Sequence, residues 1–153
     1  MPEVYTSGIF KGRGLGDIPL VAISMPIFNE GLPVGIVQGT IDVSKISNIS
    51  KMTFGREEVK IIVTDHADNV VYASEELNLA PVSPFTFAQV NHTNALPLLT
   101  INSSVTEYAY QVKTLRTGWK VYSLIDYQVI IADVEHEYLI IFINLVITLL
   151  IAA

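Results

Sequence analysis

Few residues of this 153-residue chain have the types and spacing needed for catalysis or metal binding. Asp65, His66 and Asp68 could be metal ligands, but Asp and Asn are also ordinary turn formers, and no second histidine or carboxylate pair has matching spacing. His92 and His136 are isolated. No Ser, His and Asp grouping has the local context of a hydrolase. We therefore expect no metal, no cofactor and no catalytic activity in this sequence.

A glycine-rich loop runs from Lys11 to Gly16 and contains Arg13. No Lys-Ser or Lys-Thr follows its last glycine, so it is not a phosphate-binding P-loop. Arg13 could hold a ligand carboxylate through a bidentate contact. The alternative is a solvated loop charge.

The composition excludes one class of partner and one class of site. The formal charge is −6, and the nine Lys and Arg residues are scattered, so the chain lacks the basic stripe of a nucleic-acid-binding surface. There is no cysteine, which excludes thiolate metal sites and disulfides without indicating a compartment.

Apolar runs separated by turn residues predict an antiparallel sheet of about five strands. One hairpin is expected from residues 20–28 and 34–43, and a second from residues 59–64 and 70–74 around the turn 65–69. Residues 75–90 are expected to form a loop and residues 44–52 a helical connector. Further strands are expected at residues 98–102, 106–113 and 119–125.

The second strand of the first hairpin has two chemically different faces. Gln38, Thr40 and Asp42 alternate along one face, because successive side chains of a strand point to opposite sides. The other face carries Val37 and Ile41 and is expected to be core.

The C-terminal segment, residues 138–153, contains no charge and predicts the beginning of a transmembrane helix, which needs about twenty apolar residues. A buried helix of a soluble domain is the alternative. Residues 126–137 contain acidic residues but no Lys or Arg, whereas cytoplasmic flanks favour Lys and Arg. We therefore expect this flank to lie outside the cytoplasm. Asp126 is placed to cap an exit helix that leads into the membrane.

Two sequence stretches resemble the Cache domains of bacterial transmembrane receptors. The stretches are residues 7–27, which include Ile-Ser-Met-Pro-Ile, and residues 35–43, which read Gly-Ile-Val-Gln-Gly-Thr-Ile-Asp-Val; Gly118-Trp119 follows later. The resemblance implies an α+β, PAS-like fold, in which an antiparallel sheet with flanking helices precedes a C-terminal transmembrane helix.

The double-Cache arrangement implies a division of the chain into four parts. Residues 1–50 would be the last strands of a membrane-distal module and residues 51–125 the membrane-proximal module. Residues 126–137 would be the exit helix and residues 138–153 the start of the transmembrane helix.

The resemblance also implies where a ligand would bind. Asp42 stands where family members hold a ligand amine, although a strand-end Asp can equally be exposed or a cap. Phe10 stands where amino-acid-sensing members carry Tyr, and Tyr5, Arg13, Gln38 and Thr40 complete the expected distal site. Three aromatic residues are candidates for a proximal pocket or for core: Tyr72, Tyr108 and Tyr110.

The function that follows from this interpretation is extracytoplasmic sensing. A small-molecule ligand would bind, and the exit helix would relay the change to a cytoplasmic kinase, cyclase or chemotaxis domain. The expected location is the bacterial inner membrane, with the domain periplasmic or extracellular and the receptor a homodimer. The alternative is a non-catalytic periplasmic interaction or dimerisation module, and a membrane-bound hydrolase is a weaker third hypothesis.

Overall fold

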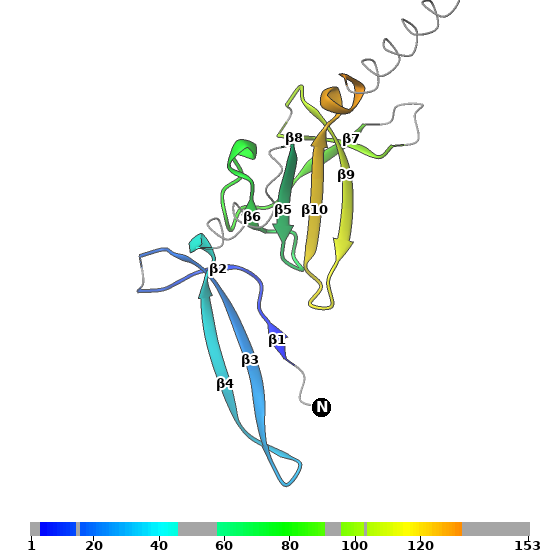
Figure 1. The fold of residues 1–153 in the computed structure, drawn as a ribbon. Helices are drawn as coiled ribbons and strands as arrows, with labels where there is room; N and C mark the ends of the chain where they lie inside the picture. Colours follow the sequence, from blue (N-terminus) through cyan, green and yellow to red (C-terminus); the bar gives the residue numbers. More distant parts are fainter. Residues whose placement is uncertain (1–3, 15, 46–57, 91–95, 103, 133–153) are drawn as a thin grey trace, which may run out of the picture. The chain divides into compact units, whose positions relative to one another are not determined.

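The computed structural model describes residues 4–14, 16–45, 58–90, 96–102 and 104–132 (Figure 1). The predicted connector beyond Lys45, His92, His136 and the predicted transmembrane segment 138–153 lie outside these residues. No helix in the described ranges is long and apolar enough to cross a membrane.

A long hairpin forms the centre of a four-stranded sheet (Figure 1). Strand β3 (Pro19–Asn29) pairs antiparallel with β4 (Leu32–Asp42), and with two short strands, β1 (Tyr5–Thr6) and β2 (Phe10–Lys11). The hairpin turn consists of Glu30 and Gly31, both with positive φ, which is the backbone that tight two-residue hairpins require. The predicted hairpin is therefore confirmed.

The predicted burial of β4 was wrong. Val37 and Ile41 were expected in the core, but they are 56% and 44% exposed, and only Val43, just after the strand, is buried. Alternation in a sequence shows which residues share a face, but it does not show whether another part of the molecule covers that face.

A six-stranded antiparallel sheet has the strand order β6-β5-β10-β9-β8-β7. It confirms the second hairpin and the three later strands, and it has six strands where about five were predicted. Strand β7 lies inside the stretch predicted as a loop, and its four residues pair with β8. The strands are β5 (Val59–Thr64), β6 (Val70–Ala73), β7 (Phe87–Val90), β8 (Leu98–Ile101), β9 (Glu107–Thr114) and β10 (Lys120–Asp126).

The chain divides into two compact units, residues 1–86 with 111–124 and residues 87–110 with 125–153. In the first unit, a small core joins residues from distant parts of the sequence: Ile9, Val21, Val43 and Val71, with Val63, Val82 and Trp119 packed against them. In the described part of the second unit, the buried apolar residues are Leu98, Leu99, Ile101 and Tyr108. The predicted boundary near residue 50 stays a prediction.

Helical structure is short in the described residues. Two 3-10 turns are present, η1 (Val43–Lys45) and η2 (Glu75–Leu77), and residues 127–132 are α-helical. The Asp126 carboxylate accepts a hydrogen bond from the backbone N–H of Gln128 at 2.9 Å. This is the N-cap contact that the sequence predicts, because a cap side chain satisfies a free N–H of the first turn.

Candidate ligand-binding face

The pairing register of the four-stranded sheet brings distant candidate residues into rows. Tyr5 lies opposite Ser24, and Ser24 lies opposite Gln38. In a second row, Phe10 lies opposite Leu20, and Leu20 lies opposite Asp42. Directly opposite residues of an antiparallel pair project from the same face, so each row joins side chains from three strands.

Both rows lie on the same face of the sheet. Leu20, Ala22 and Ser24 alternate along β3 and therefore point to one side, and Ala22 lies opposite Thr40. Five predicted ligand contacts thus share one surface, which we call the ligand face: Tyr5, Phe10, Gln38, Thr40 and Asp42. The ligand face offers two aromatic rings, an amide, a hydroxyl and a carboxylate, which is suitable chemistry for a small polar ligand.

The loop that carries Arg13 lies against the Leu20 end of this face. A Cβ atom on Gly12 would lie 2.7 Å from Leu20 Cδ1, so the loop approaches the Leu20 side chain as closely as a glycine allows. Arg13 itself is exposed. The sixth predicted contact therefore belongs to a segment that borders the ligand face.

Asp42 has one carboxylate oxygen engaged and one open. Its Oδ1 accepts hydrogen bonds from the Ser44 hydroxyl, at 2.5 Å, and from the Ser44 backbone N–H, at 3.0 Å. Within the described residues, no hydrogen bond reaches Oδ2. The hydrogen bonds at Oδ1 support the alternative that Asp42 stabilises a turn. Oδ2 can still accept a hydrogen bond from a ligand.

The charge of Asp42 suits a cationic partner. The hydrogen bond from the Ser44 hydroxyl, assisted by the Ser44 N–H, lowers the pKa of Asp42 from its ordinary value against the opposing effect of desolvation. The carboxylate is therefore ionised at neutral pH, as a contact to an ammonium group requires.

The three candidate residues for the proximal pocket lie on two strands that are not neighbours. Tyr72 is on β6, whereas Tyr108 and Tyr110 are on β9, and β5 and β10 come between them in the strand order. Tyr108 is buried. The Tyr110 hydroxyl accepts a hydrogen bond from Gln89 Nε2 at 3.2 Å, and its ring lies 6.1 Å from that of Phe87. These contacts are typical of packing residues.

Tyr72 lines an open groove of about 540 Å³ that sequence reasoning did not identify. The groove lies between η1 and the segment that follows β6, and its lining includes Val43, Ser44, Val71, Glu75 and Asn78. Tyr72 was the only lining residue of this groove that the sequence indicated as a pocket candidate, because the other lining residues come together only in the folded chain.

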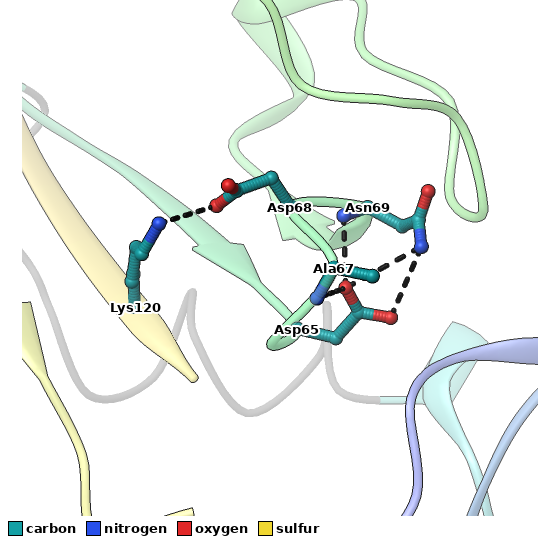
Figure 2. Close-up of polar contacts among 5 residues, drawn as sticks. All are labelled: Asp65, Ala67, Asp68, Asn69 and Lys120. Carbon is teal, nitrogen blue, oxygen red and sulfur yellow. Dashed lines mark hydrogen bonds and ion pairs between the residues drawn. The ribbon is translucent and has the colours of Figure 1, made fainter. Parts of the chain in front are cut away.

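The Asp65, His66 and Asp68 group forms a turn. Asp65 Oδ1 accepts hydrogen bonds from the backbone N–H groups of Ala67 and Asn69, both at 2.9 Å (Figure 2). Asp68 forms an ion pair with Lys120 at 2.8 Å. The described part of the chain holds no cluster of three His, Cys, Asp or Glu residues suited to a metal ion.

Comparison with known proteins identifies the type of fold. No protein-family model and no curated protein sequence matches the chain. Solved structures do match. The periplasmic domain of RsbU from Chlamydia trachomatis aligns with a TM-score of 0.56 at 11% identity, covering 84% of this chain and 58% of that one. The chain has the fold of a periplasmic sensor domain.

Two further structures with this sensor-domain fold come from a kinase and a chemoreceptor. The sensor domain of the Vibrio cholerae histidine kinase DctB aligns with a TM-score of 0.52 at 10% identity, covering 82% of this chain and 56% of that one. The ligand-binding domain of the Campylobacter jejuni chemoreceptor Tlp3, in complex with 4-methylisoleucine, gives 0.56 at 12% identity, with coverages of 85% and 50%. The chain thus spans 50% to 58% of these domains. The predicted PAS-like sensor fold is confirmed for the described residues, which are mostly β-sheet, whereas the flanking helices and the transmembrane helix stay predictions.

Proposed function

We propose that the chain is the extracytoplasmic ligand-sensing region of a bacterial transmembrane receptor, and that its ligand is a small molecule with an ammonium group. The observation that carries this proposal is the ligand face, where the ionised Asp42 carboxylate, with one open oxygen, shares a surface with four other predicted contact side chains. An ammonium group donates to Asp42 Oδ2, while Phe10 and Tyr5 supply apolar contact area.

The sensor-domain fold supports the same ligand class. The related Tlp3 domain was solved with 4-methylisoleucine, a molecule that carries an amino group beside an apolar side chain. Gln38 and Thr40 can hydrogen-bond the polar end of such a ligand, and Arg13 can pair with its carboxylate. The departure at Phe10 removes one hydroxyl and makes this edge of the face more apolar.

Membrane attachment and relay complete the proposed function. Residues 138–153 anchor the receptor in the inner membrane, and the exit helix that Asp126 caps passes the signal to a cytoplasmic kinase, cyclase or chemotaxis domain. The receptor acts as a homodimer, and this region performs no catalysis. The supports are the charge-free C-terminal segment, its acidic flank and the sensor-domain fold.

A protein-interaction module is the second candidate function, and one observation favours it. The face of the hairpin opposite the ligand face exposes five apolar side chains: Ile23, Met25, Ile27, Val37 and Ile41. A contiguous apolar surface of this kind is typical of an interaction site. On this alternative, no small molecule would bind the ligand face.

Calorimetric titration of the full-length receptor tests the proposal directly. The probes are the twenty proteinogenic L-amino acids and a series of simple aliphatic amines. We expect at least one probe to bind, and Asp42→Asn to weaken its binding about ten- to hundredfold, because the ammonium group loses its charged partner. Asn keeps the local turn, because its side-chain oxygen can accept from Ser44 in the same way.

Two further variants separate binding from turn formation. Asp42→Ala removes both roles and should lower the melting temperature as well as the affinity. Ser44→Ala removes a donor to Oδ1 only and should leave the affinity nearly unchanged. If Asp42→Asn binds every probe as tightly as the parent protein, Asp42 is not a ligand contact.

A further inference from the structure

The turn between β5 and β6, residues 65–69, contains a carboxylate that is almost fully buried. Among the described residues, only Thr64 and Asp65 are buried polar side chains, and Asp65 is 1% exposed. Part of its hydrogen bonding is local. Besides the N–H groups of Ala67 and Asn69 at Oδ1, the Asn69 side-chain amide lies 3.4 Å from Oδ1 and 3.2 Å from Oδ2. These contacts hold the turn in shape.

The second carboxylate oxygen reaches a segment far away in the sequence. Asp65 Oδ2 accepts a hydrogen bond from the backbone N–H of Ile9 at 3.0 Å, across 56 residues. A Cβ atom on Gly8 would lie 2.7 Å from this oxygen. The close approach of the two segments therefore depends on the buried Asp65 carboxylate in the turn and on Gly8, which has no side chain, in the other segment.

Apolar packing surrounds this contact. Ile9 and Val21 belong to the small core of the first unit, and Trp119 packs against that core. A charge-assisted hydrogen bond that is shielded from water is stronger than one on the surface. Breaking it leaves a buried carboxylate with fewer donors, which is costly. The segment that holds Ile9 and the turn are therefore held together firmly.

The same turn contacts the start of β10. Asp68 Oδ1 lies 2.8 Å from Lys120 Nζ (Figure 2). The Asp68 carbonyl accepts a hydrogen bond from the N–H of Phe85 at 2.8 Å. Lys120 is the first residue of β10, and β10 ends at Asp126, the residue that caps helix 127–132. One five-residue turn thus holds the segment between β1 and β2 through Asp65 and the first residue of β10 through Asp68.

We propose that residues 65–69, the coupling turn, transmit ligand occupancy from the ligand face to β10 and thus to the exit helix. This inference rests on the proposed function, because Tyr5 and Phe10 of the ligand face flank Ile9. A ligand that contacts Tyr5 and Phe10 shifts the segment between them, the Asp65 to Ile9 hydrogen bond adjusts, and the turn moves Lys120. Asp65 and Asp68 are positioning residues and do not touch the ligand.

Coupling between two sites is reciprocal, so the proposal can be tested without a ligand. The reporter is the Ile9 N–H, whose hydrogen exchange measures the opening of the Asp65 contact. The perturbation is Lys120→Met, which removes the half-exposed ion pair between Asp68 of the turn and Lys120 of β10. Such pairs contribute little to global stability, so the variant is expected to fold. The matched control is Lys113→Met on β9, because Lys113 is exposed and makes no ion pair with the described part of the chain.

In the full-length receptor, we expect Lys120→Met to speed exchange at Ile9 about three- to tenfold, a range typical of residue-level coupling. Lys113→Met should leave it unchanged. Gly8→Ala, which presses directly on Asp65 Oδ2, should speed exchange at both Ile9 and the β10 amides. If Lys120→Met leaves exchange at Ile9 at the parent rate, or if Gly8→Ala changes only residues 5–11 and 65–69, the turn does not couple the two segments. A receptor that binds none of the amine probes would contradict the proposed function. The exchange test would still show whether the turn couples the segment around Ile9 to β10.

Discussion

Asp65 and Asp42 are both ionised carboxylates, but their surroundings give them different roles. For Asp65, desolvation raises the pKa, and hydrogen bonds from Asn69, Ile9 and Ala67 outweigh it, so that the pKa lies below its ordinary value. Asp42 is partly exposed and keeps an oxygen open. A buried and satisfied carboxylate is suited to hold structure together, whereas an exposed and partly satisfied one is suited to bind.

The lowered pKa of Asp65 predicts a specific pH dependence of stability. A carboxyl group whose folded pKa lies below its unfolded value, about 3.9, stabilises the protein above that value and loses this contribution as pH falls through the folded pKa. We expect Asp65→Asn to reduce the free energy of unfolding at pH 7 by about 1–3 kcal/mol. The difference from the parent protein should shrink progressively below about pH 4.

Denaturant unfolding of both proteins between pH 7 and pH 2.5 measures this difference. The control is Asp17→Asn, because Asp17 is exposed in a turn with φ 57°, a conformation that Asn tolerates well. Its difference from the parent protein in the free energy of unfolding should be small. A difference for Asp65→Asn that stays constant down to pH 2.5 would show that the charge of Asp65 does not contribute to stability.

The sequence could predict the local behaviour of these residues but not their long-range contacts. Asp65 as a turn former follows from its neighbours Asp68 and Asn69, and Asp126 as a cap follows from the helical pattern after it. The bond from Asp65 to Ile9 depends on how two distant segments pack. Gly8 was its only sequence signal, and a single glycine gives no partner.

At the scale of elements, the hairpin of β3 and β4 shows what a pattern can establish. The apolar runs and the turn at Glu30 and Gly31 predict both strands, and alternation assigns Gln38, Thr40 and Asp42 to one face. The addition of Tyr5 and Phe10 to that face required the register of β1 and β2. Strands of two residues carry too little periodicity to be predicted.

Strand β7 and the exposed apolar face of β4 are features that the sequence pattern did not predict. The four residues of β7 become a strand because β8 offers a partner, and pairing of this kind depends on tertiary structure more than on local propensity. The apolar face of β4 was predicted as core because most such faces are covered. In the described residues it is exposed.

For the whole molecule, we predict a membrane topology in which the sensing region lies outside the cytoplasm. The acidic flank before residue 138 lacks Lys and Arg, so residue 137 should lie outside the cytoplasm in the intact receptor. A reporter that is active only in the periplasm should show activity when fused at Glu137, and a cytoplasmic reporter at the same position should be silent. The reverse pattern would place the ligand face in the cytoplasm and overturn the proposed sensing role.

We propose above all that a small ammonium ligand binds the ligand face of the hairpin. Hydrogen exchange of the full-length receptor, measured with and without the tightest amine probe, tests this claim most directly because it locates the bound ligand by residue. We predict slower exchange in residues 5–11 and 38–44 when the probe is bound. Slower exchange confined to residues 71–81, at the groove beside Tyr72, or no change in residues 5–11 and 38–44, would contradict binding at the ligand face.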